Sequence, residues 1–289
     1  MKKILFILFF LLSETTSAQK IIGKVISEKY KTGIPYASIS YKNHSKGICA
    51  DSTGKFEIED DFLPNDSLII SCVGYFPNKL SISDASKLHE FILNEKVINL
   101  SEISVKKRAV FTVLIGSQNN DSKSILMSPI RDNYEVALLM PNVEKAEGVI
   151  KNIGFFITKH GKPKTPFRVR IYAMKEGSPA QDLLNENVII AAKRGHKWLI
   201  LDVSKYNISI PENGFVVSME YLFSNNRKYL HTFTVINRFK TKEKKISFGQ
   251  QIGLTNEFTE SFGWNRTNGG QWKKFYYSPM IRSEIEIYK

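Results

Sequence analysis

Apolar and polar residues alternate with a period of two along much of the chain. Residues 22–27, 37–41 and 68–71 show this alternation in the N-terminal third, and residues 167–172 show it most cleanly further on. A period of two is the pattern of a half-buried β-strand, whereas an amphipathic helix repeats about every 3.6 residues. No long stretch of the sequence has the helical period. The pattern therefore predicts an all-β protein.

The C-terminal part of the chain repeats the signals of a strand followed by a turn. Turn-forming glycine, proline and asparagine residues gather at 160–163, 176–179, 211–214 and 268–270. The apolar or alternating runs between such turns predict strands at residues 149–157, 167–172, 188–191, 197–203, 214–222, 229–235 and 280–287. Many short strands at regular spacing indicate a β-sandwich, here a jelly-roll-like one.

The first 18 residues have the features of an export signal. Lys2 and Lys3 are followed by an apolar run at residues 4–12 and by the small residues 16–18. The apolar run is about nine residues long, and a helix needs about 20 residues to cross a bilayer. We therefore expect residues 1–18 to be a signal peptide, and we expect no transmembrane segment after its cleavage. This predicts an exported protein, located in the periplasm, at the cell surface or outside the cell.

The remaining length suits two domains rather than one. Periodicity is lost after residue 105, where a basic run at 106–108 leads towards the polar stretch 116–122. Polar and turn-forming residues without periodicity are typical of a connection between domains. The sequence therefore predicts a first domain at residues 19–105, a linker at 106–121 and a second domain at 122–289.

Five short motifs in the first domain follow one another in a characteristic order. They lie at residues 22–25 (IGKV), 32–39 (TGIPYASI), 51–56 (DSTGKF), 71–75 (SCVGY) and 100–105 (LSEISV). This order resembles the carboxypeptidase-regulatory-like domain, which is common at the N-termini of exported Bacteroidetes proteins. The resemblance implies a small seven-stranded, prealbumin-like β-sandwich that has no chemistry of its own.

The second domain also has a partial resemblance. The patterns at residues 167–172, 179–184 and 210–217 are similar to jelly-roll domains found beside the regulatory-like domain in exported Bacteroidetes proteins. Those domains are mostly uncharacterised, so the resemblance implies a fold and a compartment and little function. The expected architecture is thus two β-sandwich domains in tandem, the second larger than the first.

The chain is strongly basic, with 41 lysine and arginine residues against 28 aspartate and glutamate residues and a formal net charge of +13. One interpretation is an acidic partner, such as an anionic polysaccharide or lipopolysaccharide. The other is a lysine-rich protein whose charges are spread over solvated faces, which the absence of a long basic run favours. The predicted export argues against nucleic acid as a partner.

Two covalent features remain open at this stage. Cys49 and Cys72 could pair in an oxidising compartment, or they could be buried thiols of the first domain. The triplets at residues 51–53 and 66–68 are similar to the acceptor for O-glycosylation in Bacteroidetes, and both also suit turns.

The chain contains no recognisable catalytic or metal-binding motif. None of the five histidines has a glutamate three residues further on, so the zinc ligands of a metallocarboxypeptidase are missing. The His-Glu-x-x-His, Gly-x-Ser-x-Gly and phosphate-binding glycine motifs are also absent from the sequence. We therefore predict no catalytic residues, no metal and no cofactor. A hydrolase of envelope glycan or peptide stays a third option, because the two carboxylates of a glycosidase need not be close in sequence.

The best binding candidates lie in a loop-rich segment near the C-terminus: Trp264, Asn265, Arg266, Trp272 and Tyr276. Aromatic faces pack on sugar rings while polar neighbours bind hydroxyl groups, and binding residues gather on loops. The competing interpretation makes the two tryptophans core residues of the sandwich. The predicted function is a non-catalytic envelope protein that binds or scaffolds, with a polysaccharide or an envelope protein as partner. An accessory to a TonB-dependent outer-membrane uptake system is the alternative, because the regulatory-like domain also precedes the plugs of such receptors.

Overall fold

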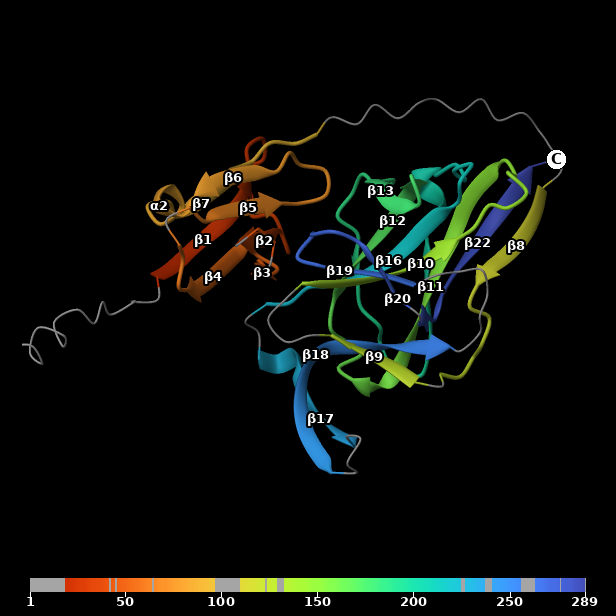
Figure 1. Cartoon of the computed structure of the whole chain (residues 1–289). Helices are drawn as coiled ribbons and strands as arrows, with labels where there is room; N and C mark the ends of the chain where they lie inside the picture. Colours follow the sequence, from red (N-terminus) through yellow and green to blue (C-terminus); the bar gives the residue numbers. More distant parts are fainter. Residues whose placement is uncertain are drawn as a thin grey trace, which may run out of the picture.

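The computed structural model describes most of the chain after residue 18 (Figure 1). The described residues are 19–41, 43–44, 46–63, 65–96, 110–122, 124–128, 133–224, 227–236, 241–255, 263–275 and 277–288. The predicted signal peptide lies outside the described residues. Strands make up most of the regular structure, and the helices described are short: α2 (Ile82–Ala85), η1 (Ser204–Tyr206) and η2 (Arg227–Tyr229). The all-β prediction is confirmed.

The first domain is a sandwich of a three-stranded and a four-stranded sheet. The smaller sheet has the order β4-β1-β7 and the larger has the order β3-β2-β5-β6. The strands are β1 (Gln19–Ser27), β2 (Ser38–Tyr41), β3 (Lys46–Cys49), β4 (Lys55–Asp60), β5 (Ser67–Ser71), β6 (Asn78–Ser81) and β7 (Glu90–Leu93). Leu68 and Ile70 of β5 and Phe56 and Ile58 of β4 are buried between the two sheets, because their alternating positions face inwards.

The second domain is a larger sandwich whose two sheets enclose one apolar core. One sheet has the order β13-β12-β16-β10-β19-β20, and the other has the order β17-β18-β11-β22-β8. Phe155 and Phe167, one from each sheet, meet edge to face with their ring centroids 5.3 Å apart. The main strands are β10 (Tyr134–Met140), β11 (Gly148–Gly161), β12 (Phe167–Lys175), β16 (Phe215–Tyr221), β18 (Lys242–Thr255), β19 (Gly263–Thr267) and β22 (Ile281–Tyr288).

The remaining strands complete both sheets. They are β8 (Val110–Gly116), β9 (Ser124–Ser128), β13 (Ser178–Asp182), β14 (Ile189–Ile190), β15 (Lys197–Asp202), β17 (Leu230–Ile236), β20 (Lys273–Phe275) and β21 (Ser278–Pro279). Strand β14 pairs with β12 in the first sheet, while β15 pairs with β11 and both β9 and β21 pair with β18 in the second. Each strand predicted in this domain overlaps one of these elements, with ends that differ by a few residues at most. The tandem-sandwich prediction is confirmed.

The predicted linker at residues 106–121 needs a correction. Residues 110–116 form strand β8, which pairs antiparallel with β22 at the edge of the larger sheet. The run Val-Phe-Thr-Val-Leu-Ile is rich in β-branched and apolar residues, and this composition favours a strand even beside a polar stretch. The second domain therefore begins before residue 122.

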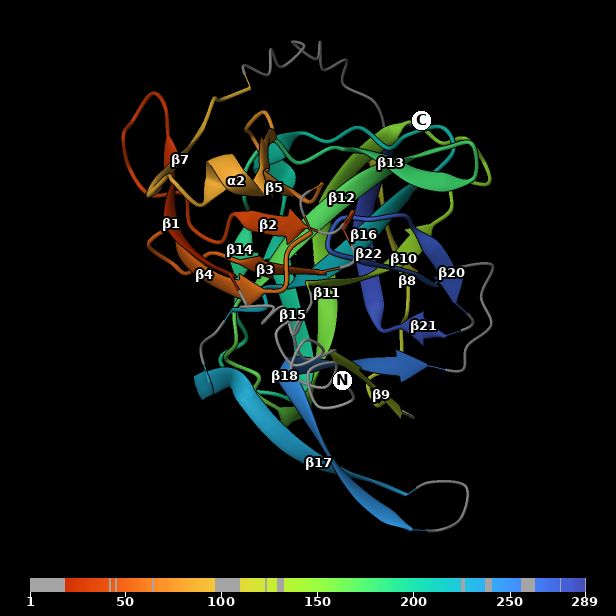
Figure 2. The same cartoon turned by 60° about the vertical axis from the view of Figure 1, so that its left-hand side comes forward.

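The first domain lies against the second (Figures 1 and 2). Phe223 and Phe248 belong to the second domain, yet they pack in the same apolar cluster as the core of the first. The backbone N–H of Cys49 on β3 also donates a hydrogen bond of 2.7 Å to the carbonyl of Phe223. The two sandwiches therefore share a packed interface.

The cysteine question is resolved by the structure. Cys49 and Cys72 are both free and buried in the first domain. Burial raises the pKa of the Cys49 thiol to about 12, so this thiol is protonated and unreactive at neutral pH.

Within the described part of the chain, none of the helices is both long enough and apolar enough to cross a bilayer.

Candidate functional site

Three of the predicted binding residues lie on strand β19, but they do not share a face. Trp264 lies opposite Ala137 and Arg266 lies opposite Glu135 on the neighbouring strand β10. Asn265 lies opposite Val136, which belongs to the core between the sheets. Because side chains alternate along a strand, Trp264 and Arg266 point to the outer face of the sheet and Asn265 points to the other face.

The two tryptophans have different environments on this outer face. Trp264 is only 5% exposed and packs against Ala137, Tyr172 and Val216. The ammonium group of Lys274 lies 5.2 Å from the centre of the Trp264 ring, so neither ring face is open to a sugar. Trp272 is half-buried and meets Tyr172 edge to face at 5.5 Å. Tyr276 lies outside the described residues.

Arg266 and Trp272 form a fixed pair. The guanidinium carbon of Arg266 lies 4.4 Å from the centre of the Trp272 ring, a cation–π geometry. The Nε of Arg266 donates to the buried carboxylate of Glu135 at 2.6 Å, and its Nη2 donates to the Tyr172 hydroxyl. The Tyr172 hydroxyl in turn donates to Glu135 at 2.9 Å. Burial raises the pKa of Tyr172 well above its usual range, so this hydroxyl keeps its proton.

The charged network continues along the same face towards the first domain. Arg170 contacts Glu220 at 3.1 Å and Asp182 at 3.2 Å, and both carboxylates are largely buried. Arg168, fully buried, donates to Glu220 at 2.8 Å. Together with the Arg266–Glu135 pair, the network joins three arginines with three carboxylates. Its charges are therefore compensated, as buried charges must be.

Arg168 also connects this network to the first domain. Its Nη2 donates to the backbone carbonyl of Tyr36, and its Nη1 donates to the Ser38 hydroxyl at 3.1 Å. Its Nε donates to the side-chain carbonyl of Asn187 at 2.7 Å, and the Asn187 amide donates to the carbonyl of Pro35 at 3.0 Å. The outer face therefore has two parts: a docking region around Arg168, and an adjacent partly exposed surface around Arg266 and Trp272.

The contribution of Asp182 to the folding stability of the protein depends on pH. Burial raises the pKa of its carboxyl to about 6 from 3.8, outweighing the attraction of Arg170. The folded state thus binds more protons than the unfolded state between these two values, so the contribution of Asp182 to stability falls as the pH rises through that window. We expect the stability of the natural chain relative to Asp182→Asn to decrease from about pH 4 to about pH 7. Free energies of unfolding measured across that range check this, and a constant difference would contradict it.

Only part of this face has a signature in the sequence. The alternation of residues 167–172 in the sequence places Arg168, Arg170 and Tyr172 on one side of a strand. Their acidic partners Glu135 and Glu220 come from strands far away in the sequence. A strand pattern predicts which residues share a face of one strand, but not which strands become neighbours.

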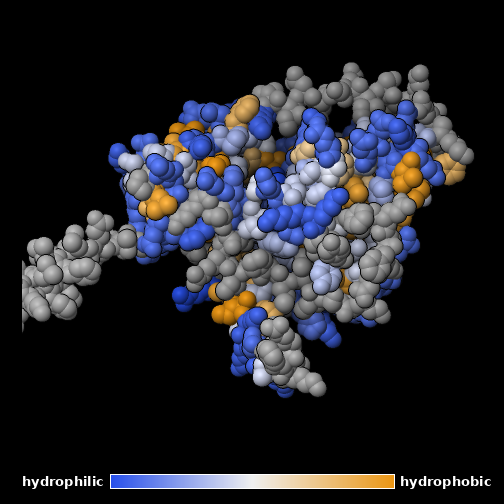
Figure 3. Space-filling model, in the orientation of Figure 1, coloured by the Kyte–Doolittle hydropathy of each residue, from blue (hydrophilic) through white to orange (hydrophobic). Residues whose placement is uncertain are grey.

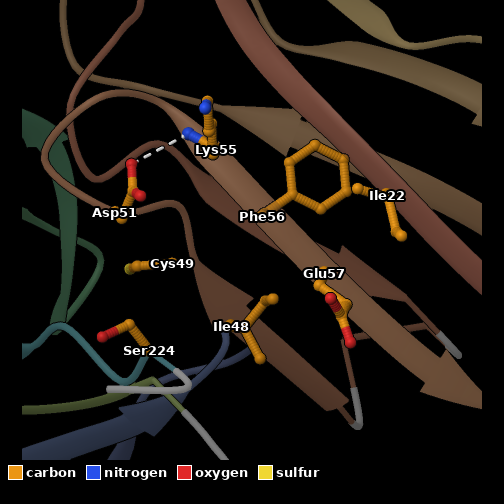
Figure 4. A pocket seen from close by; sticks show the side chains of 8 residues that line it. All are labelled: Ile22, Ile48, Cys49, Asp51, Lys55, Phe56, Glu57 and Ser224. Carbon is orange, nitrogen blue, oxygen red and sulfur yellow. Dashed lines mark hydrogen bonds between the residues drawn. The ribbon is translucent and has the colours of Figure 1, made fainter.

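Another cavity is lined mainly by residues of the first domain, with Ser224 of the second domain at its edge (Figure 4). It has a volume of about 460 Å³, and it is lined by Ile22, Ile48, Cys49, Asp51, Lys55, Phe56, Glu57 and Ser224. Asp51 accepts hydrogen bonds from the backbone N–H groups of Thr53 and Lys55, at 2.7 and 3.0 Å. Glu57 is paired with Lys20 at 2.8 Å. These carboxylates serve the local turn and a surface ion pair, so the cavity presents no convergent chemistry.

Among the described residues, no group of three or more histidine, cysteine, aspartate or glutamate side chains could hold a metal ion.

A comparison with curated proteins found no match. Solved structures with a similar chain include the cysteine protease and lectin-like domains of Cwp84, a surface layer associated protein of Clostridium difficile, at 10% identity and a TM-score of 0.38. The alignment covers 94% of this chain and 64% of that one, so this chain spans less than two thirds of its length.

A second structure, the clostridial cysteine protease Cwp84 after propeptide cleavage, matches at 9% identity and a TM-score of 0.34. That alignment covers 96% of this chain and 73% of the other.

A family comparison gives a more specific result for one part of the chain. Residues 21–105, less than a third of the whole, match the CarboxypepD_reg-like domain family. The N-terminal sandwich therefore matches the CarboxypepD_reg-like domain family, in agreement with the order of its sequence motifs.

Proposed function

We propose that this chain is a non-catalytic binding protein of the bacterial envelope, and that the outer face of its second domain binds a polysaccharide. The observation that carries the proposal is the Arg266–Trp272 pair. Its ring and guanidinium group are partly exposed, and Glu135 and Tyr172 hold them in one geometry. A preorganised aromatic ring beside a fixed hydrogen-bond donor suits a sugar, because little conformational entropy is lost on binding.

The chemistry of the carboxylates supports binding over hydrolysis. A glycosidase needs one carboxyl that donates a proton and a second that acts as nucleophile or base. On this face, Glu135 and Glu220 are at most 7% exposed and each accepts a hydrogen bond from an arginine. Asp182 is tied to Arg170 and accepts from the backbone N–H of Leu184 at 3.0 Å. The raised pKa of Asp182 would suit a proton donor, but Glu135 and Glu220 are both held by arginines and are not available as the second carboxylate.

Replacing Trp272 by alanine tests the proposal. In affinity electrophoresis against a panel of neutral polysaccharides, we expect Trp272→Ala to weaken retardation about tenfold or more, because a central aromatic anchor is lost. Trp198→Ala is a matched control: Trp198 is half-buried on β15 of the other sheet, with Arg282 stacked 4.0 Å from its ring centre. It should leave retardation unchanged. Equal retardation of both variants would overturn the proposal, and release of new reducing ends would favour a hydrolase.

A further inference from the structure

A second cavity lies at one end of the larger sandwich, where three connections meet. Its volume is about 460 Å³, and its lining residues are Lys162, Pro163, Lys164, Thr165, Lys193, Arg194, Lys228 and Tyr229. Residues 162–165 join β11 to β12, residues 193–194 join β14 to β15, and residues 228–229 lie in η2 before β17. Because residues 228–229 directly precede β17, the cavity adjoins the start of the β17–β18 ribbon, which projects from the body of the molecule in Figure 2.

The charge of this cavity is of one sign. Five of its eight lining residues are lysine or arginine, and the described residues that line it include no carboxylate. All five cationic residues are exposed, whereas Tyr229 and Pro163 are half-buried. Hydrophilic residues cover most of the coloured surface on the face shown in Figure 3, so hydrophilic character alone does not distinguish this cavity. The lining of the cavity thus differs from the Arg266 region, where carboxylates lie among the arginines.

Contacts behind the cavity anchor the backbone of the connections that carry these cations. The Thr165 hydroxyl is buried and donates to the carbonyl of Lys162 at 2.8 Å, while the N–H of Lys162 donates to the carbonyl of Gly249 at 2.9 Å. Gly195 follows Arg194 so closely against β11 that a Cβ there would lie 2.0 Å from the carbonyl oxygen of Thr158. Two of the three connections are therefore anchored on the sheet.

The aromatic residue of the cavity is fixed as well. The ring of Tyr229 packs edge to face on the ring of Phe248, with their centroids 5.9 Å apart. The ammonium group of Lys228 lies 5.4 Å from the centre of the Tyr229 ring. Tyr229 and Pro163 thus add a small apolar surface between the cationic groups. A cavity of this size is in the range that binds small ligands, about 300–1,000 Å³.

We propose that this cavity binds an acidic sugar, that is, a saccharide that carries carboxylate or sulfate groups. Four of the five cations are lysines, which bind anions as point charges and do not demand the bidentate geometry that arginine offers. The concentration of positive charge in a concave site attracts an anion, and the tyrosine and proline surfaces suit the C–H face of a sugar ring. This site goes beyond the proposed function, because it is built from other loops and recognises charge.

Charge removal in the full chain tests the inference. Binding of polygalacturonate, with carboxylate groups, and of dextran sulfate, with sulfate groups, is measured by calorimetry at physiological salt, with unsubstituted dextran as the neutral reference. We expect the double variant Lys164→Ala, Lys193→Ala to bind at least one acidic polymer about tenfold or more weakly, because two charge-assisted contacts are lost. The matched control is Lys79→Ala, Lys87→Ala, which removes the same charge from exposed positions in the first domain.

The possible results separate this site from the outer face. An unchanged control supports a specific anion site in the cavity. Equal weakening in both double variants would overturn the inference, because net charge would then explain the binding. Binding lost only in Trp272→Ala would place the ligand on the outer face, supporting the proposed function and refuting the cavity. No binding of either acidic polymer also refutes the cavity, while retardation by neutral polysaccharides still tests the outer face separately.

Discussion

Replacing Glu220 by glutamine is expected to lower the free energy of unfolding by about 3–5 kcal/mol. The carboxylate is nearly fully buried and is the acidic partner of Arg168, which is 0% exposed. A neutral amide would leave that guanidinium without its counter-charge inside the domain interface. A buried charge that loses its partner retains the full cost of its desolvation, so the loss is much larger than for a surface pair.

The measurement is denaturant unfolding of the full chain, with Glu212→Gln as the matched control. Glu212 pairs with Lys145 at 2.7 Å, but both side chains are exposed, and such pairs contribute at most about 1 kcal/mol. Burial alone would raise the pKa of Glu220, but Arg168 and Arg170 outweigh it and hold the pKa below its usual 4.5. The stabilisation should therefore be fully present above about pH 4.5 and be lost as the pH falls below it. Equal effects of the two variants would refute the role of Glu220.

Replacing Phe248 by alanine is also expected to cost about 3–5 kcal/mol, through the cavity that loss of a buried phenylalanine leaves. Phe248 is 1% exposed on β18, and its ring meets those of Phe223 at 5.1 Å and Tyr229 at 5.9 Å. Because it packs in the cluster of the first domain, its loss should also weaken the coupling between domains. We expect the natural chain to unfold in one cooperative transition and the Phe248→Ala variant to unfold in two.

Calorimetry of the full chain checks both parts of this prediction. Phe76→Ala is the control, because Phe76 is 55% exposed in the first domain and its truncation removes little buried surface. That variant should unfold in one transition near the natural temperature. A Phe248→Ala protein that also unfolds in one transition, with stability changed by less than about 1 kcal/mol, would show that this contact does not join the domains.

Local patterns in the sequence predict the strands well and their partnerships poorly. The alternation at 167–172 correctly places a strand there, because burial of one sheet face imposes that period directly on the residues. The edge strand at 110–116 was hidden by the polar residues that follow it. The sharing of Phe248 between the domains has no local signature, because it depends on the arrangement of whole sheets.

The binding surfaces illustrate the same limit. A segment with two tryptophans is compatible with either a sugar-binding surface or a buried hydrophobic core. Only the residues that contact each ring distinguish the two. Trp264 is covered by its own sheet, whereas Trp272 lies at the edge of the cluster. The basic cavity joins residues from 162–165, 193–194 and 228–229, and no window of the sequence contains enough of these charges to stand out from a lysine-rich background.

The way in which Arg168 and Asn187 recognise the first domain has a consequence for sequence divergence. Both side chains bind backbone carbonyls, those of Tyr36 and Pro35, and so two of the contacts are independent of the side chains at those positions. Tyr36 adopts a positive φ of 55°, which glycine and asparagine accept more easily than tyrosine does. Residue 36 can therefore be replaced by glycine or asparagine in related sequences while the hydrogen bond from Arg168 to its backbone carbonyl is kept. The relative orientation of the two sandwiches can thus be conserved after the side chains at their interface have diverged.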